Sequence, residues 1–128
     1  MPTVLIVDDD PSHLKIYSWI IERGGYRVVP LLAWAQPLKM PKTEPIDLAL
    51  LDYRLGESLS APDVAKLVRS AFPTAPILVL SDMMDMPEDM EEHATAFVRK
   101  GNPDQLLQTL DTFLKPNGKQ GPPAEPAA

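Results

Sequence analysis

The chain has 128 residues, a formal net charge of −6 and no cysteine, and this length fits one domain with a full hydrophobic core. The acidic balance disfavours nucleic acid as a partner, because no broad basic surface is available, and the lack of cysteine excludes thiolate metal sites, thiol catalysis and disulfides. No apolar run reaches the ~18 residues that a membrane span needs, so we expect a cytoplasmic protein with no membrane partner.

The first predicted strand covers residues 3–7 and leads directly into a cluster of acidic residues. Pro11 then favours the first turn of an amphipathic helix that ends near Arg23. Residues 26–32 predict a second strand. Pro30 restricts that strand to an edge of the sheet, because proline cannot donate a ladder hydrogen bond.

The middle of the chain predicts a short helix, a buried strand and a second amphipathic helix. The short helix is expected over residues 33–40. The run 46–52 is mostly apolar and ends on Asp52, which is typical of a central strand buried on both faces. Ser60 is the expected N-cap of the next helix, and Pro73 lies beyond the end of that helix.

The last part of the chain repeats the pattern twice. Residues 76–80 predict the fourth strand, and residues 87–94 predict a short or mobile fourth helix, because this segment has little apolar surface. A brief fifth strand is expected over residues 96–98. An amphipathic helix then begins at Pro103.

Strands and helices thus alternate, which predicts an α/β fold: a doubly wound, five-stranded parallel sheet with helices on both faces. The flavodoxin-like strand order 2-1-3-4-5 puts the strand with Pro30 at an edge and the functional crevice between strands one and three. We expect this domain over residues 1–115, followed by a flexible tail rich in Pro, Ala and Gly over residues 116–128.

Both strands that flank this crevice end in carboxylates. Asp8, Asp9 and Asp10 follow the first strand, and Asp52 ends the third. If the two strands are parallel neighbours, at least three carboxylates meet, which is unfavourable unless a cation lies among them. Mg²⁺ is a suitable cation, since it prefers a few carboxylates together with water and phosphate oxygens. Asp10 is expected to be a solvated neighbour of this site.

Four short motifs give the chain a resemblance to a known family. They are residues 4–11, 50–52, 79–81 and 98–100, each at an expected strand end. In this order they resemble the receiver domain of two-component response regulators, over about residues 3–114. The likeness is to a stand-alone receiver similar to the chemotaxis regulators. It implies a signalling domain with no turnover of a separate substrate.

The resemblance also implies what the acidic residues do. Asp52 would be the phosphoacceptor, taking a phosphoryl group from a phosphohistidine on a sensor kinase or phosphotransfer protein. Asp8, Asp9 and Asp52 would bind Mg²⁺ together with the backbone carbonyl of Arg54. Phosphorylation would then switch binding to a downstream protein.

Three further residues take roles from the same resemblance. Lys100 would pair with Asp52 and later with the phosphoryl oxygens. Ser81 would move to hydrogen-bond the phosphoryl group, and Phe97 would be the aromatic residue coupled to that movement.

The chain departs from the family pattern at two positions. Gly101 follows the lysine where the family usually has proline, and Asp82 stands where the family often has a small residue. We expect the extra charge of Asp82 to disfavour the phosphorylated state or to speed its hydrolysis. His13 and His93 lack ligand-like spacing, and we interpret both as ordinary helix residues.

Two alternatives remain open from the sequence. A pseudo-receiver would bind partners without phosphorylation. A phosphatase of the haloacid-dehalogenase type would use Asp8 as nucleophile and Asp10 as general acid, although Pro11 and Ser12 replace the Gly-Thr-like continuation expected there. The residue that carries phosphate separates these readings: Asp52 in a receiver, Asp8 in the phosphatase.

Overall fold

The computed structural model describes residues 1–33, 38–42, 45–55 and 59–115. Its centre is a five-stranded sheet in which all neighbouring strands are parallel, in the order β2-β1-β3-β4-β5. The strands are β1 (Thr3–Asp8), β2 (Arg27–Leu32), β3 (Leu48–Asp52), β4 (Ile77–Ser81) and β5 (Ala96–Arg99). The predicted sheet, its strand order and the edge position of the strand with Pro30 are confirmed.

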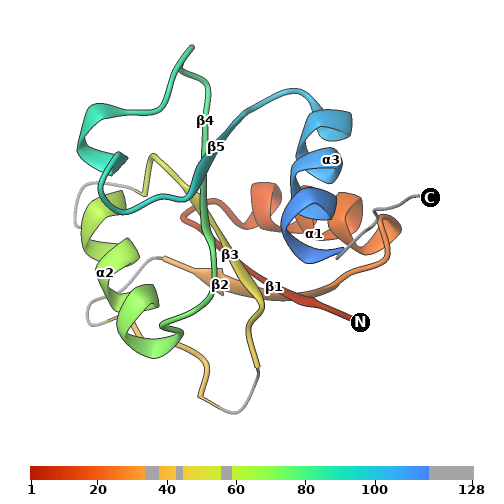
Figure 1. Ribbon diagram of the computed structural model, residues 1–128, viewed down its shortest axis with the longest axis horizontal. Coiled ribbons are helices and arrows are strands. Elements are labelled where there is room, and N and C mark those ends of the chain that lie inside the picture. Colours follow the sequence, from red (N-terminus) through yellow and green to blue (C-terminus); the bar gives the residue numbers. More distant parts are fainter. Residues whose placement is uncertain (34–37, 43–44, 56–58, 116–128) are drawn as a thin grey trace, which may run out of the picture.

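Helices cover both faces of this sheet (Figure 1). The helices α1 (Pro11–Arg23) and α3 (Pro103–Leu114) lie on one face, and α2 (Ala61–Ala71) lies on the other. Each begins with a polar N-cap and has a proline in its first turn. The cap side chain accepts a hydrogen bond from a backbone N–H that has no partner within the helix, and the proline has no N–H that needs one. The N-caps are Asp10, Ser60 and Asn102.

Side chains of the central strands alternate between two apolar layers, as the period of a strand requires. In β1, Val4 and Ile6 pack toward α1 and α3, whereas Leu5 and Val7 pack toward α2. The other central strands divide in the same way, and their apolar side chains are almost fully buried. This alternation also decides which way each residue at the end of a strand points.

The turn after α1 depends on two glycines. Gly25 has a φ of 98°, a left-handed conformation that favours glycine. A Cβ atom on Gly24 would lie 2.6 Å from Cδ2 of Leu107, so α3 packs closely against this turn. The first helix therefore ends at Arg23, as the sequence predicts.

Two expected helices are not found as predicted, and one of them lies partly outside the described residues. Of the helix expected over 33–40, residues 34–37 lie outside the described residues, and residues 33 and 38–40 are in no helix. The helix expected over 87–94 is only a 3₁₀ turn, η1 (Glu88–Met90). Met90 is its one fully buried side chain, which is too little apolar surface to hold a longer helix.

The predicted tail, residues 116–128, lies outside the described residues. Among the helices that the structure describes, none combines the length and the apolar character that crossing a bilayer requires.

Candidate functional site

The carboxyl ends of β1 and β3 bring two aspartates together. Val7 pairs with Leu51 in the sheet, so Asp8 and Asp52 follow as neighbours. Both side chains point toward the face of the sheet that α1 covers, because each lies two residues after Ile6 or Leu50, which belong to that layer. They are only 1% and 3% exposed, respectively.

Asp8 has a strongly perturbed carboxyl group. Its Oδ1 atom accepts a hydrogen bond from the backbone N–H of Asp10 at 3.0 Å. Burial, and after it the charge of Asp52, raises the pKa of Asp8 from its ordinary 3.8 to about 7. Near neutral pH, therefore, this group holds either a proton or a negative charge that calls for a neighbouring cation.

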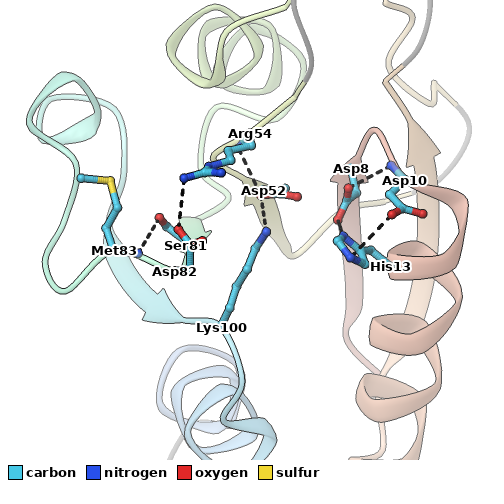
Figure 2. A network of polar contacts seen from close by, with 9 residues as sticks. All are labelled: Asp8, Asp10, His13, Asp52, Arg54, Ser81, Asp82, Met83 and Lys100. Atoms are coloured by element: carbon cyan, nitrogen blue, oxygen red, sulfur yellow. Dashed lines mark hydrogen bonds and ion pairs between the residues drawn. The ribbon is translucent and has the colours of Figure 1, made fainter.

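Asp52 is held by two donors on the opposite side from Asp8 (Figure 2). The Nζ atom of Lys100 lies 3.0 Å from its Oδ1 atom, and the backbone N–H of Arg54 donates to the same oxygen at 3.1 Å. Lys100 follows β5, where its own N–H donates to the carbonyl of Ser81 at 2.7 Å. The predicted pairing of Lys100 with Asp52 is thus present.

Ser81 and Asp82 lie at the end of β4, across the site from α1. The hydroxyl of Ser81 accepts a hydrogen bond from the N–H of Met83 at 3.1 Å. Asp82 forms an ion pair with Arg54 over 3.7 Å, and both side chains are exposed (Figure 2). The charge that we expected Asp82 to add to the site is consequently balanced by a neighbouring guanidinium.

These side chains surround an open pocket of about 600 Å³. Apart from Pro11, the residues that line it are polar or charged: Asp9, Asp10, His13, Asp52, Arg54, Asp82 and Lys100. The pocket is open to solvent and Asp52 belongs to its lining, so a phosphoryl donor could approach this carboxylate.

Sequence reasoning missed one residue of the site, His13. Asp10, expected as a solvated neighbour, is partly exposed in the lining of the pocket and also caps α1, accepting from the N–H of Ser12 at 2.8 Å. His13 is not an ordinary helix residue: its ring lies between Asp8 and Asp10, at 3.6 Å from a carboxylate oxygen of each (Figure 2). The sequence contained a signal for this contact: His13 follows Asp10 by three residues, so it lies in the first turn of α1, close to the end of β1.

Phe97 lies in β5 beside Val79, half-buried against the layer that faces α2. This placement fits a core residue and leaves its predicted coupling to Ser81 untested. His93 follows η1, and the candidate metal-binding cluster of the described residues does not include it.

The residues present fit a divalent cation. Ligand atoms of Asp8, Asp52 and His13 all lie within 4.8 Å of one another. The raised pKa of Asp8 reflects burial together with repulsion from Asp52, and a bound cation would relieve that repulsion. Asp9 lines the same pocket.

The comparison with protein families decides the identity. Residues 4–111 match the model of the response regulator receiver domain. The chain belongs to the response regulator receiver family. The match covers all five strands and favours the receiver reading over the phosphatase.

Named relatives and solved structures agree with this assignment. The transcriptional regulatory protein ZraR of Klebsiella oxytoca is 28% identical over 108 residues, which cover 84% of this chain and 23% of that protein. PhoP of Bacillus subtilis, named as an alkaline phosphatase synthesis transcriptional regulatory protein, is 35% identical over 78 residues, covering 61% of this chain and 32% of that protein. The receiver thus spans about a quarter to a third of the length of these relatives.

Among solved structures, chemotaxis protein CheY4 of Vibrio cholerae has a TM-score of 0.72 at 28% identity, covering 89% of this chain and 99% of that one. The response regulator TrrA of Thermotoga maritima, solved in complex with Mg²⁺ and BeF, has a TM-score of 0.72 at 24% identity, covering 89% and 100%. At 24% identity, the similarity to TrrA supports the fold only.

The receiver is therefore a signalling domain of two-component response regulators. The expectation that nucleic acid is not a partner finds no support, because several relatives are named transcriptional regulators.

Proposed function

We propose that Asp52 accepts a phosphoryl group from a phosphohistidine on a sensor kinase or phosphotransfer protein. One observation carries this proposal: a buried carboxylate at the end of a central strand has Lys100 at 3.0 Å and opens to a polar pocket. Buried carboxylates are costly unless charged or hydrogen-bonding partners compensate for the lost water. Here Lys100 and the N–H of Arg54 compensate one oxygen of Asp52, and Asp52 still belongs to the lining of the pocket.

The chemistry asks for few groups. An oxygen of Asp52 attacks phosphorus, the bond from phosphorus to the imidazole nitrogen breaks, and the leaving imidazole takes a proton. Lys100 and the N–H of Arg54 already bind the carboxylate, and each can donate to the developing negative charge.

Mg²⁺ is the cation we assign to this site, held by Asp8, Asp9 and Asp52 with the backbone carbonyl of Arg54. When bound, it supplies neutralisation of the charge on the phosphoryl oxygens. Asp8 contributes by being buried and fixed by the N–H of Asp10, so that its carboxylate is oriented before the donor arrives.

We infer a switching role for Ser81. Its hydroxyl now accepts from the N–H of Met83, and turning toward a phosphoryl group on Asp52 would break that bond. The loop after β4 would then change its conformation, with Phe97 as the coupled aromatic residue. The output is binding of another protein by a cytoplasmic receiver, residues 1–115.

The test is intact-mass analysis after incubation with acetyl phosphate and Mg²⁺. Wild type should gain the mass of one phosphoryl group, and Asp52→Ala should gain none. Asp104→Asn, in the exposed first turn of α3, is the matched control and should behave as wild type. An unmodified wild type, retested with a phosphorylated phosphotransfer protein, would favour a pseudo-receiver; modification of Asp52→Ala would overturn the assignment of the acceptor.

A further inference from the structure

We propose that His13 supplies a nitrogen ligand to the cation site beside Asp8 and Asp52, so that this receiver binds transition-metal ions such as Ni²⁺ much more tightly than an all-oxygen site would. The inference deepens the proposed function, because it concerns the same cation site. It rests on the position of the imidazole ring, which α1 holds over the end of β1 (Figure 2).

The first argument is the spacing of the donor atoms. Asp8, His13 and Asp52 each offer one ligand atom, and these atoms lie within 4.8 Å of one another. Nitrogen and oxygen ligands lie about 2.1 Å from a first-row transition metal, so two ligands of one ion are at most about 4.2 Å apart. Side-chain rotations that move the ligand atoms by about 1 Å would bring all three onto one ion.

The second argument is the state of the ring nitrogen that faces the carboxylates. The Nδ1 atom of His13 is buried and has no hydrogen-bond partner among the described residues. Its distance of 3.6 Å from Oδ2 of Asp8 is longer than a hydrogen bond. A buried polar nitrogen without a partner is costly, and a metal bond satisfies it.

The third argument is the other nitrogen of the same ring. Nε2 lies 3.6 Å from Oδ2 of Asp10, while Oδ1 of Asp10 is held by the N–H of Ser12 at 2.8 Å. Histidine ligands commonly have a carboxylate beside the second ring nitrogen, which fixes the tautomer and makes the ligand more basic. The N-cap of α1 thus places Asp10 beside Nε2, from where a small movement would give a hydrogen bond that orients His13 toward the ion.

The chemistry then predicts selectivity. Imidazole suits Ni²⁺, Cu²⁺ and Zn²⁺, whereas Mg²⁺ prefers oxygen and gains little from a nitrogen ligand. The chain has no cysteine, so no thiolate can bind these metals instead. It has only two histidines, and His93 follows η1 outside the cluster. Removing His13 should consequently affect the two kinds of ion unequally.

The experiment is calorimetric titration of the untagged full chain with NiCl₂ and, separately, with MgCl₂. His13→Gln should weaken Ni²⁺ binding by about tenfold or more and change Mg²⁺ binding by less than about threefold. His93→Gln is the matched control and should change neither. Asp10→Asn keeps an N-cap oxygen but removes the carboxylate beside His13, and should weaken Ni²⁺ binding alone by a smaller factor.

A second readout assigns the ligand directly. In proton NMR spectra, Ni²⁺ should broaden the imidazole resonances of His13 at concentrations that leave those of His93 sharp. Equal weakening of both ions by His13→Gln would mean that the ring acts only through charge or packing, and an unchanged Ni²⁺ affinity would mean that it is no ligand. Either result overturns the inference, while phosphorylation of Asp52 by acetyl phosphate in Mg²⁺ reports on the proposed function independently.

Discussion

The two sides of the pocket at the carboxyl edge of the sheet are built differently. On one side, the 13-residue helix α1 is capped by Asp10 and packs into the core through Leu14 and Ile21. On the other, residues 82–95 connect β4 to β5 with only the 3₁₀ turn η1, and Met84 in this connection is 72% exposed. The α1 side is therefore held by packing into the core, whereas the connection on the other side has little regular structure.

Two tyrosines show the same contrast. Tyr26 is almost fully buried and donates its hydroxyl proton to Asp111 of α3. Tyr53 donates to Asp89 of η1 at 2.9 Å in an exposed position. Both hydrogen bonds raise the pKa of the tyrosine, but for Tyr26 burial is the larger cause. The pairing is thus shared, whereas the burial of the two hydrogen bonds differs.

Truncating a buried side chain on each side tests this contrast most strongly. Ile21→Ala should lower the free energy of unfolding by about 2–5 kcal/mol, because rigid neighbours in α1 and the sheet leave a cavity. Met90→Ala should cost less, since η1 is short enough to close over the gap. Urea unfolding of both variants measures these losses, and a larger loss of unfolding free energy in Met90→Ala than in Ile21→Ala would contradict the comparison.

The pH dependence of stability in the metal-free protein tests the cost of the buried charge of Asp8, which lies on the α1 side. Because the pKa of Asp8 is raised to about 7, its protonated form stabilises the fold below pH 3.8, and this contribution is lost as pH rises toward 7. In the presence of a chelator, Asp8→Asn should match wild type at low pH and exceed it above pH 7 by at most about 4 kcal/mol. Parallel stability curves from thermal unfolding would contradict this.

The tyrosine pairs give an intermediate effect. Tyr26→Phe should cost about 1–2 kcal/mol, because it removes a hydrogen bond to a charged group at a buried position. Tyr53→Phe should cost clearly less at its exposed position. Chemical denaturation at neutral pH measures both, and similar losses would mean that burial does not set the strength of these pairs.

The smallest expected effect concerns the ion pair between Arg54 and Asp82. Asp82→Ala should leave stability within about 0.5 kcal/mol, since both side chains are exposed. The freed guanidinium of Arg54 can then approach a phosphoryl group on Asp52, so the phosphoryl half-life should lengthen by at most about fivefold. An unchanged or shorter half-life would show that Asp82 does not compete for Arg54; Arg54→Ala is the companion variant and should shorten the half-life.

The sequence by itself determined the sheet, its order and the residues at its carboxyl edge. Apolar runs, proline positions and N-caps are local properties, and the alternation along β1 and β3 already directs Asp8 and Asp52 to one layer. Only the tertiary structure decided which groups surround these aspartates. Arg54 and Asp82 pair beside the site because separate elements meet there, and this pairing depends on packing between segments that are distant in the chain.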